Sequence, residues 1–458
     1  LSLSLSLSLS LSLSLSLLKL RPSTLSPCPL RQCQSGYIQS LFSMIDIAST
    51  TMAVAVALVV LLASLGASQQ HDRGAFVGTV SNNSLVLSPP ADGRVLIDGT
   101  DFRTLVETLE TVKQQLETVK QQLEAYTDGQ QCVTVADTTS LTGLTGTWRG
   151  GVLSNSGKIY GIPGSATSVL IIDPATNTAD TTTLSGIAAG EDKWSGGVLA
   201  GNGKIYGIPF ALTSVLVIDP VTDTASTTSL TVLGDGAAHN WAEGVLAPNG
   251  KIYGVPYSSA SVLIIDPVAN TTDTTTITGL NGGGKWWGGT LAGDGKIYCT
   301  PFASNSVLII DPATNSADIT TITGLANFGA QWIGGVLAGN GMIYAIPYES
   351  TSVLIVDPVA GTADTTTIDG LTGSSKWYNG VLGGNGKIYC GALNSASVLI
   401  IDPVSNTADA TTIANLDGDS KWWGGVVAPN GMIYGMPMHH ASALIIQQAC
   451  SASVRKGV

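Results

Sequence analysis

Side chains that could carry acid–base or nucleophilic chemistry are sparse in this chain. Only four histidines occur among its 458 residues, at His71, His239, His439 and His440. Serine is abundant, but no G-x-S-x-G motif occurs and no histidine recurs with the repeat described below. The adjacent pair His439-His440 could bind a metal, although adjacent histidines in a loop are usually just solvated. The sequence therefore identifies no catalytic residue, metal site or cofactor.

Aromatic residues next to lysines give the more informative pattern. Tryptophan recurs every 45 to 47 residues, at Trp148, Trp194, Trp241, Trp286, Trp332, Trp377 and Trp422. A lysine directly precedes four of them, at Lys193, Lys285, Lys376 and Lys421, and a second aromatic directly follows three, at Trp287, Tyr378 and Trp423. Tyr257 and Tyr348 belong to a second loop of the same repeat.

An aromatic ring beside a polar donor can recognise a sugar or an apolar ring, because the ring stacks on C–H surface while the donor binds hydroxyls. We therefore take these nine lysine and second-aromatic positions as candidate ligand-binding residues. The alternative is that the repeated tryptophans only pack between neighbouring units.

The period of this repeat predicts the fold. Each of seven units begins at a repeated tryptophan, and its consensus runs through an Asn-Gly or Asp-Gly pair, an Asp-Pro pair and a Thr-rich segment. Four strand-sized runs separated by turn signals in about 45 residues are typical of one four-stranded propeller blade. We expect the Asn-Gly pairs to form type I′ turns. The sequence predicts an all-β, seven-bladed β-propeller over residues 132–450.

The ends of the repeat predict how the ring closes. The unit that begins at Trp422 lacks a fourth strand, and the segment Ala136–Leu141 matches the missing Thr-rich strand. We expect this N-terminal strand to complete the last blade, which removes a free sheet edge. The same alignment places Cys132 and Cys450 in one inter-strand loop of that blade and predicts a disulfide between them.

The repeat also resembles known families. The runs N-G-K-I-Y at Asn202–Tyr206 and S-V-L-I-I-D-P-A-T-N-T at Ser168–Thr178 are similar to YVTN-type surface-layer propellers and, more loosely, to kelch repeats. The kelch Gly-Gly after the Tyr, and the kelch Trp after D-P-x-T-N-T, are both missing. Because both families are propellers, the resemblance implies the same fold, but it implies no ligand and no catalytic residue.

The N-terminal segments point to export. Residues 1–43 form a low-complexity leader, which reads as a translated upstream repeat, or else as an amphipathic strand or targeting segment. Residues 44–68 contain an apolar core of about a dozen residues, which indicates a signal peptide or a signal anchor. We expect a secreted or cell-surface protein, with N-glycosylation sequons at Asn82 and Asn270.

Two further segments precede the propeller. Residues 69–101 are expected to form short strands. Residues 102–127 contain the heptad LETVKQQ twice in tandem, with leucine and valine alternating along one seam. This pattern predicts a short coiled-coil helix that joins three or four copies, or else an amphipathic helix that packs on the propeller.

The net charge of −12 argues against nucleic-acid binding. We expect a binding or adhesion propeller for a carbohydrate or protein ligand on the loop face, made multivalent by the coiled coil. A hydrolase or lyase at the channel mouth and a structural cell-wall or matrix protein are the alternatives. An enzyme would need acid or base groups that break the sevenfold pattern at one mouth, whereas near-identical blades favour binding.

Overall fold

The computed structural model describes residues 130–232, 239–325 and 329–452, with the backbone alone at 130–133 and 448–452. It also describes the backbone of two short hairpins, formed by β1 (Gly78–Ser81) with β2 (Ser84–Leu87) and by β3 (Leu96–Ile97) with β4 (Thr100–Asp101). The leader at 1–43, the predicted signal segment at 44–68, the predicted coiled coil at 102–127 and Asn82 lie outside the described residues.

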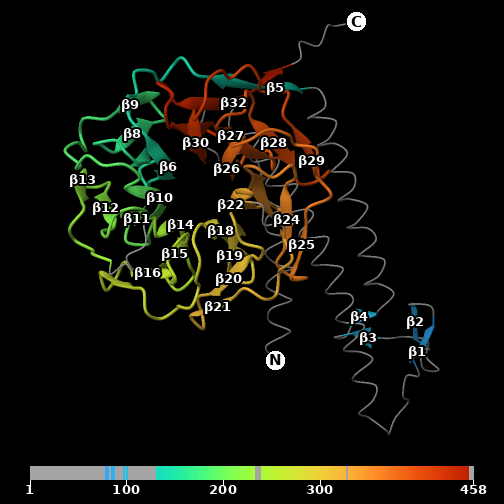
Figure 1. Cartoon of the computed structure of the whole chain (residues 1–458). Coiled ribbons are helices and arrows are strands. Elements are labelled where there is room, and N and C mark those ends of the chain that lie inside the picture. The colour runs from blue at the N-terminus through green and yellow to red at the C-terminus, as the bar shows by residue number, and fades with distance from the viewer. Residues whose placement is uncertain are drawn as a thin grey trace, which may run out of the picture.

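Seven four-stranded antiparallel sheets follow one another around a ring, so the predicted seven-bladed propeller is confirmed (Figure 1). Blades one to three are β6 (Trp148–Leu153) to β9 (Thr178–Asp180), β10 (Trp194–Leu199) to β13 (Thr224–Ser226), and β14 (Trp241–Leu246) to β17 (Thr271–Asp273). Their middle strands are β7 (Ile159–Pro163), β8 (Leu170–Asp173), β11 (Ile205–Pro209), β12 (Leu216–Asp219), β15 (Ile252–Pro256) and β16 (Leu263–Asp266).

Blades four to six repeat this order. They are β18 (Trp286–Leu291) to β21 (Ser316–Asp318), β22 (Trp332–Leu337) to β25 (Thr362–Asp364), and β26 (Trp377–Leu382) to β29 (Thr407–Asp409). Their middle strands are β19 (Ile297–Pro301), β20 (Leu308–Asp311), β23 (Ile343–Pro347), β24 (Leu354–Asp357), β27 (Ile388–Ala392) and β28 (Leu399–Asp402).

The seventh blade joins the two ends of the repeat. It contains β30 (Trp422–Val427), β31 (Ile433–Pro437) and β32 (Leu444–Ala452), and its fourth strand is the N-terminal β5 (Gln130–Asp137). Figure 1 shows β5 lying beside β32 where the ring closes. Ile445 pairs with Asp137 as Ile171 pairs with Asp180 in blade one, so the predicted closure is confirmed.

A bulge near the start of each first strand directs the residues that follow the tryptophan. In blade two, Trp194 pairs with Pro209, but the next pair is Gly197 with Gly207, so the first strand carries one extra residue. All seven first strands show the same register shift. A bulge of this kind re-aims side chains that regular alternation would send to opposite faces of the sheet.

The core consists of clusters shared between neighbouring blades. Trp148 of blade one is fully buried and packs in one cluster with Tyr434 and Met436 of blade seven. Its indole N–H donates to the Ser168 carbonyl at 2.9 Å, and the other six repeated tryptophans donate to the equivalent serine carbonyl. These seven tryptophans therefore pack between blades, as the packing alternative proposed.

The Asn-Gly turns differ from the expectation. Gly203 has a φ of 79° but Asn202 does not have a positive φ, and Gly203 N–H donates to the Ala200 carbonyl at 2.9 Å. A type I′ turn needs positive φ at both central residues, so that prediction was wrong. The observed loop is a turn that ends in one left-handed glycine, and it leaves the asparagine side chain free for other bonds.

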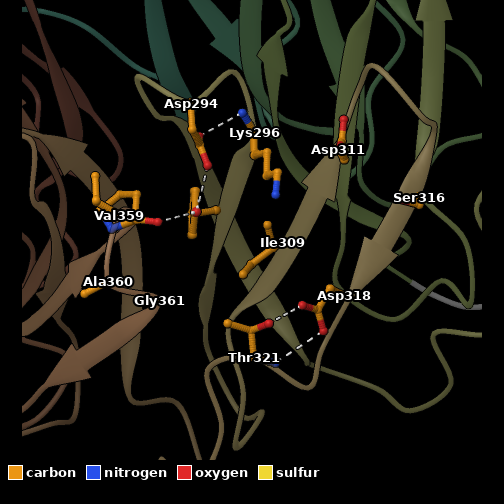
Figure 2. A pocket seen from close by; sticks show the side chains of 12 residues that line it. Asp294, Lys296, Ile309, Asp311, Ser316, Asp318, Thr321, Val359, Ala360 and Gly361 are labelled. Carbon is orange, nitrogen blue, oxygen red and sulfur yellow. Dashed lines mark hydrogen bonds between the residues drawn. The ribbon is translucent and has the colours of Figure 1, made fainter. Parts of the chain in front are cut away.

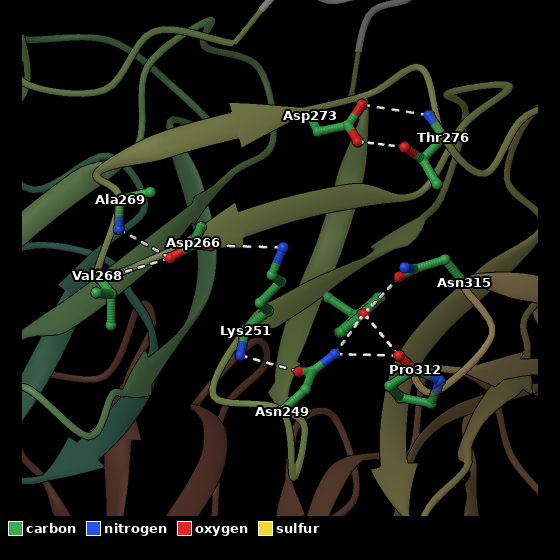
Figure 3. A network of polar contacts seen from close by, with 10 residues as sticks. Asn249, Lys251, Asp266, Val268, Ala269, Asp273, Thr276, Pro312 and Asn315 are labelled. Atoms are coloured by element: carbon green, nitrogen blue, oxygen red, sulfur yellow. Dashed lines mark hydrogen bonds and ion pairs between the residues drawn. The ribbon is translucent and has the colours of Figure 1, made fainter.

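These asparagines join neighbouring blades. Asn249 donates to the Tyr253 hydroxyl at 2.9 Å and to the Pro312 carbonyl of the next blade at 3.1 Å, while Tyr253 donates to Asn315 at 2.8 Å (Figure 3). Asn202, Asn340 and Asn430 reach the next blade's proline carbonyl in the same way. This face of the ring therefore holds the blades together.

Candidate functional site

Seven residues, one from each blade, meet around the axis of the ring on the opposite face. Each directly follows a repeated tryptophan, and the bulge turns it inward. We call them the inner layer: Arg149, Ser195, Ala242, Trp287, Ile333, Tyr378 and Trp423. All are buried, with at most 8% of their surface exposed. Five of the seven belong to one hydrophobic cluster, so the irregular positions of the repeat converge on one place.

A second set of side chains surrounds this layer. They come from the loop between the second and third strands, and we call them the rim: Phe210, Tyr257, Phe302, Tyr348, Leu393 and Met438. Phe210 and Leu393 are buried, whereas Tyr257, Phe302, Tyr348 and Met438 are half-buried. Blade one has Gly164 at this position, and a Cβ there would lie 2.9 Å from Cγ of Arg149. The aliphatic part of Arg149 therefore fills the place of a rim side chain.

The aromatic rings of the two sets are in mutual contact. The rings of Tyr378 and Trp423 have centroids 3.6 Å apart, and Trp287 lies 6.0 Å from Trp423 and 5.4 Å from Phe302. Phe302 in turn lies 6.0 Å from Tyr348. We call the inner layer and rim together the mouth. It gathers all five aromatic residues predicted as ligand-binding, although ligand contact by them stays a prediction.

The four predicted lysines have other partners. Lys285 donates through Nζ to the carbonyls of Tyr257 (3.1 Å), Ser259 (3.0 Å) and Gly282 (2.6 Å). Lys376 bonds the equivalent three carbonyls, and Lys193 and Lys421 also donate to loop carbonyls. Burial lowers the pKa of Lys193, Lys376 and Lys421. Each ammonium group therefore bonds the loops where two neighbouring blades meet. Ligand binding by these lysines stays a prediction.

A charged network lies at the edge of the mouth. Arg149 donates through Nη2 to Asp192, and the other Asp192 oxygen lies 3.4 Å from Nε2 of His239. The guanidinium carbon lies 4.6 Å from the Trp423 ring centroid and 5.4 Å from that of Phe210. His239 stacks on Phe210 at 4.5 Å. One arginine thus links the charged edge to the aromatic centre.

Unpartnered buried polar atoms concentrate at this mouth. Eight such atoms occur among the described side chains, and six of them belong to the inner layer: Nε and Nη1 of Arg149, Nε1 of Trp287, Nε1 of Trp423, and the hydroxyls of Ser195 and Tyr378, which interact weakly with each other. Leaving a buried donor unpaired costs about 1–3 kcal/mol. Such a cluster therefore marks a place where something other than packing has shaped the side chains.

One step further along the first strands, two residues break a ring of glycines. The second residue after the tryptophan has positive φ in every blade, and it is Gly150, Gly196, Gly288, Gly334 or Gly424 in five of them. Blade three has Glu243 there (φ 66°) and blade six has Asn379 (φ 53°). Side chains other than glycine are strained in this conformation.

Glu243 and Asn379 meet across the axis. Asn379 Nδ2 donates to Oε1 and Oε2 of Glu243 at 3.1 and 3.3 Å, although blades three and six lie on opposite sides of the ring. The neighbouring glycines make room: a Cβ at Gly288 would lie 2.9 Å from Oε2 of Glu243, and one at Gly334 would lie 2.3 Å from Oδ1 of Asn379. The pair therefore depends on the glycines that remain.

The environment of Glu243 makes its charged form costly. Surrounding protein atoms desolvate the carboxyl group, although the residue keeps some exposure along the axis. Burial raises the pKa of Glu243 to about 7, and the hydrogen bond from Asn379 opposes that rise. Burial also raises the pKa of Tyr378 well above its usual value; the charge of Glu243 adds to that rise and the charge of Arg149 opposes it. A strained backbone and a buried carboxyl group therefore occur together at Glu243, a combination that is typical of functional positions.

Sequence reasoning missed Arg149, Ser195, Glu243 and Asn379. The signal was present, since Glu243 and Asn379 stand where five other units have glycine. A regular strand gives these two positions no special direction. Only the bulge directs their side chains to the axis of the ring.

His440 and the Asp-Pro carboxylates have structural partners within the described residues. His440 shares a hydrogen bond with Ser442, and its ring lies tilted against Trp422, with 4.7 Å between the ring centroids. Asp173 accepts a backbone N–H at 2.9 Å within its own turn, as the other Asp-Pro carboxylates do. No group of three or more potential metal ligands occurs among the described residues. Nor does any helix in this part of the chain have the length and apolarity to span a membrane.

A hollow of about 250 Å³ lies between blades four and five on the Asn-Gly face (Figure 2). Its polar groups bond one another: Tyr298 donates to Asp294 at 3.0 Å and to Pro358 at 3.2 Å, and Thr321 donates to Asp318. An equivalent hollow lies between blades two and three. Because the hollow recurs with the repeat, we assign it no ligand.

The predicted disulfide partners are directly opposite in the sheet. Cys450 pairs with Cys132 in the β32–β5 ladder, so the prediction that both lie in a loop was wrong. The two strands continue past the point where other blades turn, since they belong to different ends of the chain. Opposite residues of an antiparallel pair have Cα atoms about 4.5–5.5 Å apart, which suits a disulfide; the bond stays a prediction. Asn270, the second sequon, is exposed on a turn.

Comparison with known proteins supports the fold. No protein-family model and no curated sequence matches the chain, so the resemblance to kelch and YVTN-type propellers stays a prediction. Virginiamycin B lyase from Staphylococcus aureus, solved with quinupristin, matches with a TM-score of 0.55 and 12% identity over 69% of this chain and 99% of that one. A streptogramin B lyase matches with a TM-score of 0.54 and 12% identity over 70% and 98%.

The fold also occurs as part of larger proteins. The extracellular domain of a one component system, BT4673 from B. thetaiotaomicron, matches with a TM-score of 0.51 and 11% identity, over 68% of this chain and 42% of that one. At these identities the likeness shows the propeller fold alone.

Proposed function

We propose that this chain is an extracellular or cell-surface binding protein whose ligand occupies the mouth. The observation that carries the proposal is that the irregular residues of all seven blades, Arg149 to Trp423 of the inner layer, converge on one place. Residues that a repeat does not need for packing are free to serve recognition. An apolar centre with a few polar groups is the usual composition of a small-ligand site.

This arrangement favours one site per chain. The inner layer contains an arginine, a serine, an alanine, two tryptophans, an isoleucine and a tyrosine, so no two neighbouring blades present the same surface at the axis. Multivalency would then come from association of chains through the predicted coiled coil, and each propeller would contribute one site. We propose a glycan as the ligand, because the half-buried rings of Tyr257, Phe302 and Tyr348 offer faces for stacking on sugar C–H groups.

Proteins built on the same fold are compatible with this proposal. One solved neighbour is the extracellular domain of a one component system, which supports an extracellular location for this chain.

The test is a glycan-array screen of the full chain with matched variants. Phe302→Ala combined with Tyr348→Ala removes half-buried rim rings and should abolish array signals while leaving the melting temperature within a few degrees. The control is Val268→Ala combined with Val359→Ala, which changes exposed side chains on the opposite face (93% and 95% exposed). Equal signals from both double variants would refute a ligand at the mouth.

A hydrolase or lyase is the second candidate, and Glu243 is the observation that favours it. Glu243 stands where five other blades have glycine, and its pKa near 7 suits a group that donates or accepts a proton. Two solved neighbours are lyases. The discriminating experiment incubates bound glycan with the wild type and with Glu243→Gln. Turnover that only the wild type shows would establish the enzyme, whereas unchanged glycan with both proteins supports binding alone.

A further inference from the structure

The inner layer has more hydrogen-bond donors than acceptors. Arg149 keeps two of its three guanidinium nitrogens unpartnered, and the indole N–H groups of Trp287 and Trp423 are unpartnered too. Indole N–H and guanidinium groups can only donate. Among the buried side chains that the structure describes, the one unpartnered oxygen that can only accept is Oδ1 of Asn240. The mouth is therefore matched to a molecule that supplies acceptors.

The carboxyl groups of the chain near these donors are already engaged. Asp192 accepts from Arg149 Nη2 and lies within 3.4 Å of His239, and Glu243 accepts from Asn379 on the far side of the axis. Arg149 itself is 92% buried, with its ring neighbours Trp423 at 4.6 Å and Phe210 at 5.4 Å. A buried, planar guanidinium with free donors is suited to a carboxylate, which accepts more than one N–H in the same plane.

We propose that the ligand of the mouth is an acidic sugar, whose carboxylate binds Arg149 and whose ring lies against the half-buried aromatic side chains of the rim. This inference rests on the proposed function and adds the chemical class of the ligand. The indole N–H groups of Trp287 and Trp423 donate to the carboxylate or to neighbouring hydroxyls. Partly exposed His239, which stacks on Phe210, and partly exposed Met438 of the rim are the side chains that we expect to turn aside for entry.

The place of Arg149 in the ring explains why the site is single. Arg149 is the only arginine or lysine at the position after a repeated tryptophan, and Gly164 gives its side chain the room that a rim aromatic takes in four other blades. Replacing Arg149 with the residue that any other blade has there would remove the guanidinium, and replacing Gly164 with a rim aromatic would remove its space. The hydroxyls of a neutral glycan can also accept from these donors, but they lack the charge and the planar pair of oxygens that a carboxylate offers to the guanidinium, so the site favours the acidic sugar.

The test compares acidic glycans with their neutral counterparts. The full chain is applied to an array that carries uronate- and sialate-terminated glycans beside the same glycans without the acidic sugar. Affinities for the strongest pair are then measured for Arg149→Met, which keeps the aliphatic packing but removes the donors. The matched control is Lys204→Met, which removes a cation that pairs with Asp219 at 3.2 Å on the opposite face.

We expect the acidic glycan to bind at least about tenfold more tightly than its neutral counterpart, and Arg149→Met to weaken it about tenfold or more. Lys204→Met should change nothing. Because Arg149→Met could lower stability, Arg149→Lys is measured alongside; it keeps the charge but lacks the planar fork, and it should also bind more weakly.

The outcomes separate this inference from the proposed function. If neutral and acidic glycans bind equally and Arg149→Met changes nothing, while Phe302→Ala with Tyr348→Ala abolishes binding, the mouth is the site and the acidic sugar is wrong. If no variant at the mouth affects binding, both proposals fail. If no glycan on the array binds, the assignment of a sugar is overturned.

Discussion

Replacing Glu243 with glutamine should stabilise the propeller at high pH. Glutamine keeps an oxygen that can accept from Asn379 and keeps a similar shape, so the substitution removes mainly the ionisable group. In the folded chain the pKa of this carboxyl is raised from 4.5 to about 7. A shift of one unit in the pKa between the unfolded and the folded chain corresponds to about 1.4 kcal/mol. The ionised carboxylate therefore costs the folded state on the order of 3 kcal/mol at pH 8.

The sign of the pH dependence follows from linkage. Below pH 4.5 the carboxyl is protonated in both the folded and the unfolded chain, so the wild type and the Glu243→Gln variant should differ little through ionisation. Between pH 4.5 and 7 only the unfolded chain has lost the proton, so the free energy of unfolding of the wild type falls as pH rises. Above pH 7 the difference from Glu243→Gln should be constant.

The measurement is thermal unfolding of the full chain at pH 4 and pH 8. A propeller of roughly 320 residues unfolds with an entropy near 0.7 kcal/mol per kelvin, so a gain on the order of 3 kcal/mol raises the melting temperature by about 4 °C at pH 8. The matched control is Asp180→Asn. Hydrogen bonds from Thr183 and Thr182 lower the pKa of Asp180 to about 2, so its loss should destabilise the protein at pH 8. A Glu243→Gln protein that is no more stable than the wild type at pH 8, or equally stabilised at both pH values, would refute this account.

Three further predictions concern the ring. Deleting residues 130–137 should remove the fourth strand of blade seven and lower the melting temperature sharply; an unchanged melting temperature would argue against closure by β5. Non-reducing peptide mapping of the exported protein should link Cys132 to Cys450, and two free thiols would contradict the bond. Trp287 and Trp423 are both at least 94% buried, so changing either to alanine should cost about 3 kcal/mol or more in urea unfolding. A double variant as stable as the wild type would show that these rings do not pack as described.

The fold could be predicted because it depends on spacing that the sequence displays directly. The tryptophan period predicted the number of blades, and the match of Ala136–Leu141 with the Thr-rich strand predicted the closing strand, as the pairing of Asp137 with Ile445 confirms. Each of these signals either lies within one strand or recurs seven times, so chance alone would rarely produce it.

The site could be predicted only in part because its residues are positioned by a backbone irregularity. The aromatic residues were found since they stand out beside the repeated tryptophan. Glu243 and Asn379 were missed because regular alternation assigns them no special direction, and the bulge that turns them to the axis is a property of the paired strands. The carbonyls around the lysines could not be predicted, because a sequence does not show which loops surround a side chain; ligand binding by these lysines stays a prediction.

The same limit applies to the turns. Asn-Gly is the composition of a type I′ hairpin, yet here the asparagine bonds a tyrosine hydroxyl and a carbonyl of the next blade. The bond from the asparagine to the next blade joins two repeats, so it could not be predicted from the sequence of one repeat.

The central claim is that the mouth binds one ligand per chain, and a titration tests it most directly. The strongest array glycan is titrated by calorimetry into the full chain at known concentration. We predict one glycan bound per chain, and no heat of binding with Phe302→Ala combined with Tyr348→Ala. Several equal sites per chain, or unchanged binding by that double variant, would contradict the claim that the irregular residues of all seven blades build a single site.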